Sequence, residues 1–315
     1  MTDSTPTMTN STTHPTPAAS LPPAQSATAT RVLTPGRRAL LKFLRHRLAI
    51  LGFVVISTMA LLAIAAPLVA PHDPAKLDLV HTKQPPNAVH LLGTDAFGRD
   101  VLSRVIYGGR VSLLVGLIAV GIYETIAIVL GSIAGYYRGA ADWIIGRLVD
   151  VVMTFPSLVV IIFMVAILGP SIFNCMLAIG LLGWTGPTRL VRGQFLQLRE
   201  MDYITAARSI GVPDWRIILR HMLPGVLTPV VVNATFGIAA AILTEAALSF
   251  LGLGVQPPTA SWGNMMSDAQ SLDILQNMPW LWAPPGIAIM LAVLSINFVG
   301  DGLRDALDPK GMLRT

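Results

Sequence analysis

The sequence predicts an all-α membrane protein that crosses the bilayer several times. Of its 315 residues, 53% are hydrophobic and only 12% are charged, and the mean hydropathy of +0.64 is too high for a water-soluble domain. Several uncharged runs approach or pass the ~20 residues that a helix needs to cross a hydrocarbon core. Lys and Arg cluster beside these runs and not along one soluble face. The sequence pI near 9.7 is therefore attributed to topology and not to nucleic-acid binding.

Six membrane spans are predicted, in a transmembrane domain that covers residues 37–315. Residues 1–36 precede it and are rich in Ser, Thr, Pro and Ala, so they cannot bury a core and are expected to form a disordered cytoplasmic tail. The fourth span is the shortest, because glycine and proline interrupt it. The approximate ranges of the spans are 48–70, 111–134, 148–168, 172–188, 226–253 and 280–300.

The first apolar run could instead be the core of a cleaved signal peptide. Such a core is about 7–15 residues long and lies close to the N-terminus. Here the uncharged run covers residues 48–70 and follows a long leader, so an uncleaved span is favoured. The single cysteine, Cys175, lies in a later apolar run and has no partner for an internal disulfide, which favours a structural role.

Residues 71–110 form a polar loop, punctuated by proline, between the first and second spans. Its last part, 101–108, fits a short surface helix that leads into the bilayer. The histidines of this loop and one aspartate are spaced too irregularly to indicate a metal or catalytic site, so a solvated extracytoplasmic loop is expected. These residues are His72, Asp73, His81 and His90.

The distribution of Lys and Arg orients the spans. With the N-terminus in the cytoplasm, 17 of the 22 basic residues fall in cytoplasmic segments, and the other five all lie in the loop 71–110. The opposite orientation would place the 17 outside, against the positive-inside rule. Both termini and residues 199–224 are therefore expected in the cytoplasm.

The stretch 199–224 is polar, lies between long apolar runs, and is interpreted as two short helices joined at a hinge. In the first helix, four apolar residues recur at i, i+3, i+4 and i+7, which predicts one apolar face of mostly small residues. They are Tyr203, Ala206, Ala207 and Ile210. Gly211 follows at the position where a helix commonly ends with a residue at positive φ.

The second helix is expected to begin at Pro213 and Asp214, because proline suits the first helical turn and a carboxylate suits the N-terminal end of the helix dipole. Pro224 is expected to end it. Arg216 and Arg220 lie one turn apart on a basic face. The predicted apolar stripe consists of Trp215, Ile218, Leu219 and Met222. Such a pair suits a groove on another protein, although periodicity alone favours an ordinary interfacial helix pair equally.

This stretch resembles the loop of ABC-importer permeases that docks into their ATPase subunits. The family pattern is Glu-Ala-Ala, three residues, Gly, nine residues, an apolar residue, any residue, and Leu-Pro. Thr205 stands here in place of the Glu and His221 in place of the apolar residue. The docking residues that the resemblance implies are Tyr203, Thr205, Ala206, Ala207, Gly211, Trp215, Arg216, Arg220, His221, Leu223 and Pro224.

Three further blocks are similar to the second permease subunit of the dipeptide/oligopeptide/nickel group of importers. One lies near the second span, one runs from the end of the fifth span into the following loop, and one lies at the C-terminus. Their residues are 93–100, 245–263 and 297–309. The resemblance covers roughly residues 35–312.

The resemblance implies the fold of a type I ABC importer permease in a bacterial inner membrane, surrounded by lipid. It implies three kinds of protein partner: a homologous second permease, cytoplasmic ABC ATPases, and an extracytoplasmic substrate-binding protein. Short peptides are the expected substrate, with nickel or another small solute as the alternative. None of the four lysines follows a glycine, so the chain lacks a phosphate-binding loop and is expected to be a transport subunit without an ATPase site or cofactor.

Glu124 and Glu245 are the acids deepest in the predicted spans, where a charge costs ~2.5–3.5 kcal/mol on insertion scales. Each is either a substrate contact or proton relay, or a hydrogen-bonded group at a helix interface. For Glu124 the structural interpretation is favoured, whereas for Glu245 the two stand equal. Gly252 and Gly254, close to Glu245, are candidates for an outer gate on the translocation path.

Two other classes of protein remain as alternatives. A proton-driven secondary transporter would use the two buried acids, but the docking stretch would have no task in it. A membrane-embedded hydrolase ranks last, because the sequence contains neither a Gly-x-Ser-x-Gly elbow nor a His-Glu-x-x-His pair.

Overall fold

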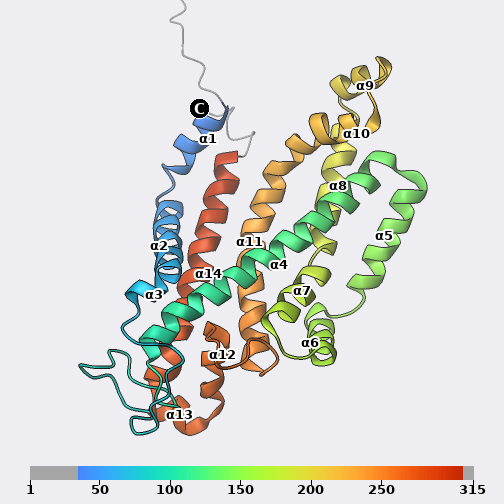
Figure 1. Cartoon of the computed structure of the whole chain (residues 1–315). Helices are drawn as coiled ribbons and strands as arrows, with labels where there is room; N and C mark the ends of the chain where they lie inside the picture. Colours follow the sequence, from blue (N-terminus) through green and yellow to red (C-terminus); the bar gives the residue numbers. More distant parts are fainter. Residues whose placement is uncertain (1–34, 308–315) are drawn as a thin grey trace, which may run out of the picture.

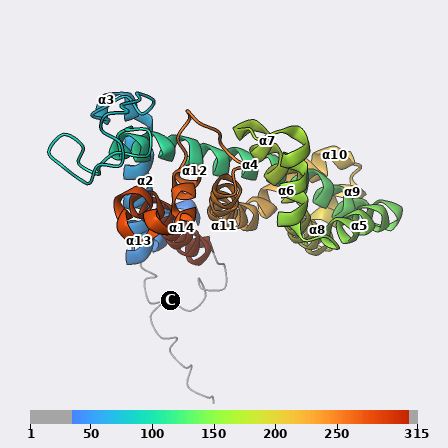
Figure 2. The same cartoon turned by 90° about the horizontal axis from the view of Figure 1, so that it is seen from below.

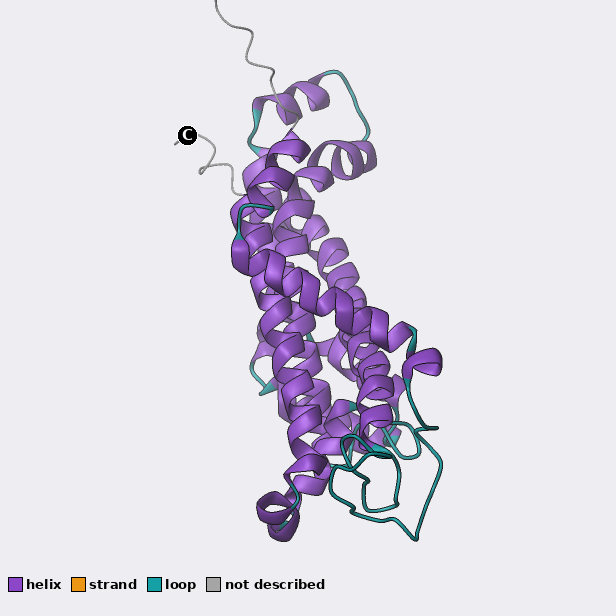
Figure 3. Ribbon diagram, turned by 90° about the vertical axis from the view of Figure 1, so that its left-hand side faces the viewer, coloured by secondary structure: helices purple, strands orange, loops and turns teal. Residues whose placement is uncertain are grey.

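Helices form all the regular secondary structure in residues 35–307, which are the residues that the computed structural model describes, apart from one bridge between Thr94 and Asp100 (Figure 3). The all-α prediction is confirmed for this part of the chain. The predicted N-terminal tail lies almost entirely outside it.

The helices in chain order are α1 (Pro35–Phe43), α2 (Arg47–Ile64), α3 (Ala66–Val69), α4 (Val101–Tyr137), α5 (Gly139–Met153), α6 (Ser157–Leu168), α7 (Ile172–Leu182), α8 (Thr185–Arg199), α9 (Asp202–Ser209), α10 (Asp214–Arg216), the π-helix η1 (Ile217–Met222), α11 (Leu223–Phe250), α12 (Trp262–Met266), the 3₁₀-helix η2 (Ser267–Gln270), α13 (Leu272–Asn277) and α14 (Pro279–Leu307).

Four helical segments of the described chain are long and apolar enough to cross a membrane: α2, α4, Asp214–Phe250 and α14. A fifth crossing is formed if α5 and α6 are counted as one span, although they meet at 82°. Pro156 lies in the break between them. Proline lacks an amide donor and disfavours helical conformation in the residue before it, which accounts for the bend.

The predicted fourth span, 172–188, is not a single helix. It is divided between α7, which has 11 residues, and the first turn of α8, which continues through a polar sequence to Arg199. Six single spanning helices are thus not found in residues 35–307, where the count is four, or up to five.

The helix α4 is longer than the sequence indicated. The expected surface helix and the second span form one helix of 37 residues. Asp100 caps its start, because the Asp100 carboxylate accepts a hydrogen bond of 2.8 Å from the Ser103 amide.

The centre of the fold is α4, which crosses the molecule diagonally and packs against α7, α8 and α11, while α2 packs along α14 (Figures 1 and 2). Glycines allow the close contact of α4 with α8. A Cβ on Gly131 would lie 2.7 Å from the Cβ of Val191, and one on Gly135 would lie 2.5 Å from the Cβ of Phe195. Small residues at such contacts are typical of packed membrane helices.

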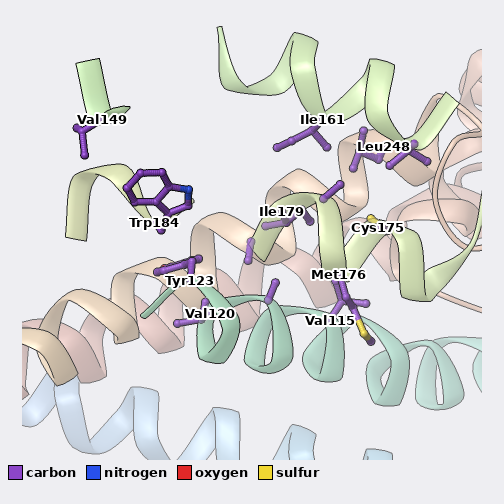
Figure 4. Close-up of a cluster of buried hydrophobic side chains, with 14 of the residues drawn as sticks. Val115, Val120, Tyr123, Val149, Ile161, Cys175, Met176, Ile179, Trp184 and Leu248 are labelled. Atoms are coloured by element: carbon purple, nitrogen blue, oxygen red, sulfur yellow. The ribbon is translucent and has the colours of Figure 1, made fainter. Parts of the chain in front are cut away.

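The largest cluster of buried hydrophobic side chains lies where α4, α6, α7 and α11 meet (Figure 4). It includes Val115 of α4, Ile161 of α6, Ile179 of α7 and Leu248 of α11. Cys175 is fully buried in the same cluster, which supports a structural role for its side chain.

Different elements lie at the two ends of the molecule. The long loop between α3 and α4 lies at one end, together with α12 and α13 (Figure 1). The helices α9 and α10 lie at the opposite end, as do α1 and the C-terminal end of α14. The docking stretch is therefore separated from the long loop by the full length of the helical bundle.

Candidate functional site

The hinge of the docking stretch has the backbone conformation that the sequence predicted. Gly211 has φ +76°, directly after the end of α9. The Gly211 amide donates to the Arg208 carbonyl (2.9 Å) and the Val212 amide to the Ala207 carbonyl (3.1 Å). These bonds satisfy carbonyls at the end of α9 in the manner of a Schellman motif, so the prediction of a glycine at positive φ is confirmed.

The predicted apolar face of α9 is divided between two sides of the helix. Ala207 is buried beside Ile204, which the periodic pattern left out, whereas Tyr203, Ala206 and Ile210 are exposed. Ile204 packs in a cluster with Phe195 of α8, and this contact seats α9 on the bundle. The prediction that all four residues share one face of the helix was therefore wrong.

The second apolar stripe is divided in the same way. Met222 is fully buried and Ile218 is partly buried, while Trp215 and Leu219 are exposed. Together the two helices leave a set of four large apolar side chains exposed, here called the docking face. It consists of Tyr203 (49% exposed), Ile210 (80%), Trp215 (59%) and Leu219 (56%).

Pro224 does not end the second helix, contrary to the prediction. It occupies the first turn of α11, and the helical segment runs without a break from Asp214 to Phe250. The π-helix η1 lies directly before it, and the Leu223 amide donates to the Ile218 carbonyl, five residues back. Wider π-type bonding accommodates a proline that has no amide donor and whose ring crowds the preceding turn. The docking stretch is thus continuous with a membrane-spanning helix.

Tyr136, at the end of α4, connects the docking stretch to the bundle, and sequence patterns did not single it out. Its hydroxyl donates to Asp214 Oδ1 (2.6 Å), and its carbonyl accepts from Arg199 Nη1 (2.6 Å). The Arg208 guanidinium lies 4.9 Å from the centre of its ring. One residue of α4 therefore contacts α8, α9 and α10.

The other predicted docking residues differ in their environments. The Arg216 guanidinium is 5.3 Å from the centre of the Trp215 ring, and Arg220 is exposed one turn further on. His221 Nδ1 lies 3.2 Å from the Arg216 carbonyl. Thr205 is exposed, and Leu223 is partly buried at the start of α11.

Glu245, the candidate gate residue of α11, is fully buried and hydrogen-bonded. Its two oxygens accept from Ser112 of α4 (3.0 Å) and from Ser249 one turn along α11 (2.7 Å). The same two hydroxyls accept from the amides of Trp262 (3.3 Å) and Val255 (3.1 Å). The carboxyl group thus links two spans to the loop that follows α11.

Gly252 and Gly254 shape the start of that loop. Gly252 has φ +78°, a conformation that glycine adopts at little cost. A Cβ on Gly254 would collide with the Ser249 hydroxyl. Gly252 therefore serves the turn, whereas Gly254 allows the close approach of the loop to the Glu245 hydrogen bonds.

A cavity of about 450 Å³ lies farther along the bundle, between α4, α6, α7, α11 and the start of α8. Polar atoms reach it from Tyr123, Thr185, Asn233 and Thr244, while Glu245, Gly252 and Gly254 are not among its lining residues. Asn233 also donates to Glu124 Oε1 (2.8 Å), which places Glu124 at the contact of α4 with α11.

Comparison with known proteins assigns this architecture to a family. Residues 127–311 match the family described as "Binding-protein-dependent transport system inner membrane component". Residues 34–86 match the "N-terminal TM domain of oligopeptide transport permease C". The fold resembles a chain of the MetNI methionine ABC transporter in an inward-facing conformation, with a TM-score of 0.53 and 16% identity over 65% of this chain and 96% of that chain.

Curated relatives match along nearly their whole length. The dipeptide transport system permease protein DppC of Alkalihalophilus pseudofirmus is 44% identical over 92% of this chain and 93% of its own. The oligopeptide transport system permease protein OppC of Bacillus subtilis is 38% identical over 86% of this chain and 88% of its own. The glutathione transport system permease protein GsiD of Pectobacterium atrosepticum is 41% identical over 89% and 92%.

The fold and these matches define a multi-pass inner membrane component of binding-protein-dependent transport systems. Within that class, the chain belongs to the family of DppC- and OppC-like permeases of ABC importers.

Proposed function

We propose that this chain is the permease subunit of an ABC importer that carries short peptides across a bacterial inner membrane. The energy comes from ATP hydrolysed by partner subunits. The observation that carries the proposal is the docking face, an exposed apolar surface at the end of a helix that continues into the bundle. The printed names of the DppC and OppC relatives support peptides as substrates.

The docking face is the surface that an ABC ATPase would cover. Its aromatic and aliphatic side chains suit the apolar centre of a protein interface, and the exposed Arg216 and Arg220 suit a polar rim. Because α10, η1 and α11 form one continuous segment, a displacement of the docking face would reach the membrane-spanning part of α11 directly. Tyr136 would pass the same displacement to α4.

The proposed topology has six spans, with residues 172–188 of α7 and α8 as the fourth and both termini in the cytoplasm. The concentration of 17 of 22 basic residues in the segments assigned to the cytoplasm supports it. The position of α9, α1 and the end of α14 at the same end of the molecule supports it as well.

At the opposite end, the long loop and α12–α13 are proposed to face the extracytoplasmic binding protein. The cavity beside Tyr123 and Asn233 is proposed as part of the path, which a homologous second permease would complete. Glu245 is proposed to fix the shape of the outer gate, because both of its oxygens are engaged by serine hydroxyls.

Reconstitution tests this function. The chain is co-expressed with a second permease, ABC ATPases and a binding protein, and uptake of labelled di- and oligopeptides into proteoliposomes is measured. In proteoliposomes whose lumen corresponds to the cytoplasm, peptide uptake should require ATP in the lumen. Peptide uptake driven by a proton gradient without ATP would favour a secondary transporter. Uptake of nickel but not of peptides would show that nickel, and not a peptide, is the substrate.

Labelling of single cysteines tests the topology. In a Cys175→Ser background, a cysteine at Ser267 in η2 should react with an impermeant reagent in intact cells, whereas one at Ser209 in α9 should react only after permeabilisation. Equal labelling of the two from outside would contradict the proposed orientation.

A further inference from the structure

Three residues from separate parts of the long loop meet at the start of α4. His72 follows α3 by a few residues, His90 lies near the end of the loop, and Asp100 is the N-cap of α4. One possible ligand atom from each lies within 4.8 Å of the others. The spacing in sequence gave no indication of a metal site here, because the contact depends on how the loop folds back on α4.

Two of the three distances between ligand atoms are close to those expected around a single ion, and the third pair, His72 and His90, lies within 4.8 Å. Asp100 Oδ1 lies 3.0 Å from His90 Nδ1 and 3.7 Å from His72 Nδ1. Ligands held ~2.0–2.2 Å from a tetrahedral zinc ion are roughly 3.3–3.6 Å apart, so displacements of a few tenths of an ångström would bring these two pairs to the required separation.

Asp100 Oδ1 is the atom that the two imidazoles share: it is hydrogen-bonded to His90 Nδ1, and His72 Nδ1 lies 3.7 Å from it. Asp100 Oδ2 is engaged by the Ser103 amide (2.8 Å) and hydroxyl (2.7 Å), whereas Oδ1 faces the two imidazoles. His72 Nδ1 is buried without a hydrogen-bond partner among the described residues. A buried ring nitrogen without a partner is unfavourable unless something else, such as an ion, satisfies it.

Ser103 supports two of the three residues at once. Its hydroxyl donates to Asp100 and also accepts from the His72 amide (3.1 Å). Groups that orient the ligands in this way are a regular feature of metal sites in proteins. His90 is held through its amide, which donates to Asn87 Oδ1 (2.8 Å) in a tight turn.

We propose that His72, His90 and Asp100 bind one divalent transition-metal ion, for which Zn²⁺ is the best-suited candidate. Two imidazoles and a carboxylate are ligands that zinc accepts, and a fourth position stays open for water. Structural zinc ions usually have four protein ligands, so the structural role that we assign to this ion rests on its position in the fold and not on its coordination. The ion would fasten two points of a loop without regular helices to the start of α4, on the side of the molecule opposite the docking face.

The test is zinc binding by the purified full-length chain in detergent, carrying an affinity tag without histidine. After chelator treatment, Zn²⁺ is titrated against a chromophoric chelator and the bound metal is measured by mass spectrometry. We expect one ion per chain. His72→Ala and His90→Ala should each weaken binding by more than the roughly 10–100-fold that loss of an outer-shell partner costs, and Ser103→Ala should fall within that range.

His81→Ala is the matched control, because His81 lies in the same loop but pairs with the exposed Asp78 (2.8 Å). It should bind zinc as the wild type does. His72 Nδ1 has no hydrogen-bond partner in residues 35–307, so His72→Ala is expected to fold normally, as its gel-filtration profile will show. Co²⁺ offers a second readout, since its visible absorption should report a four-coordinate site that His72→Ala removes.

The proposal is overturned if the wild type binds no zinc, or if His72→Ala and His81→Ala bind it equally well. Either result would leave His90 and Asp100 as a hydrogen-bonded pair only. The outcome is independent of the transport proposal, because metal binding is measured on the isolated chain.

Discussion

The Tyr136 hydroxyl donates a hydrogen bond of 2.6 Å to the Asp214 carboxylate, and this bond joins the end of α4 to the start of the helix that carries half of the docking face. The sequence assigned Asp214 only a helix-dipole role, worth ~0.3–1 kcal/mol. The structure adds a hydrogen bond to a charged acceptor, a type that contributes about 1.5–3 kcal/mol.

Tyr136→Phe is therefore expected to uncouple the docking stretch from α4. The ring stays in place beside Arg208, so the variant should reach the membrane and bind the ATPase, while peptide uptake per complex falls several-fold. Asp214→Ala should have the same effect, and Asp214→Asn, which keeps an acceptor oxygen, should be milder. Normal uptake by Tyr136→Phe would show that this bond plays no part in coupling.

Gly211→Val should abolish ATPase binding. No atom lies within 4 Å of a Cβ built on Gly211, so the penalty comes from φ +76° alone, and is ~1–2 kcal/mol for a residue with a Cβ. The hinge would shift toward negative φ and separate the two parts of the docking face. Membrane abundance should stay near normal, and Gly211→Ala should be milder.

The control for the hinge is Gly193→Val in α8. A Cβ there also meets open space, but Gly193 lies within a helix and not at positive φ. It should co-purify with the ATPase at wild-type yield. If Gly211→Val does so too, the hinge is not required for docking.

Sequence periodicity located the two short helices of residues 199–224 but not the side of each helix that is buried. Heptad-like spacing identifies apolar positions, yet α9 uses Ile204 and Ala207 to pack inward and leaves Tyr203 and Ile210 outside. A short helix held between a bundle and a partner has two apolar sides, and spacing alone cannot tell which one the chain itself covers. The positive φ of Gly211 was predictable because it depends on local chemistry.

Contacts between segments that are distant in the chain could not be predicted from the sequence either, because they depend on how the elements pack. Tyr136 and Asp214, or His72 and Asp100, become neighbours only when α4 is placed against the other elements. The ends of two helices were predicted wrongly because proline breaks the helix at one position and is accommodated within it at another. Pro156 lies in a sharp break, whereas Pro224 is absorbed into a continuous helix by the π-helix before it.

Trp215→Ala should weaken ATPase association more than any other truncation of the docking face. Trp215 is 59% exposed, and large aromatic residues at the centre of an interface commonly account for ~2 kcal/mol or more of binding. Pull-down with the purified ATPase measures the effect. Leu77→Ala, an equally exposed apolar position (59%) in the long loop at the opposite end, should leave the yield unchanged. Equal losses in both would argue against a specific docking face.

Stability should fall as pH rises through the range in which Asp268 ionises. Burial raises the pKa of Asp268 and the nearby Asp95 carboxylate raises it further, against the opposing effect of Arg104 and Arg99. The folded state therefore holds the proton above the ordinary pKa of 3.8, and stability is lost between that value and the raised pKa.

Asp268→Asn should remove this dependence. The melting temperature of the variant should exceed that of the wild type at pH 7, and the difference should shrink toward pH 4. Asp273→Asn, an exposed change in the neighbouring α13, should match the wild type at each pH. A difference for Asp268→Asn that grew on acidification would reverse the assigned sign.

Substitutions of Glu245 distinguish a structural role for this residue from a role as a proton carrier. A glutamine can accept from one of Ser112 and Ser249 and donate to the other, so Glu245→Gln should preserve the packing of α4, α11 and the following loop. Glu245→Ala leaves both hydroxyls without their acceptor in a buried site, a loss of about 1–3 kcal/mol for each group left unpaired. We therefore expect Glu245→Gln to keep most ATP-driven peptide uptake and Glu245→Ala to lower both membrane abundance and uptake. Uptake per folded molecule, measured in proteoliposomes, distinguishes the two roles: a proton carrier would lose activity as fully with glutamine as with alanine, because neither side chain can ionise.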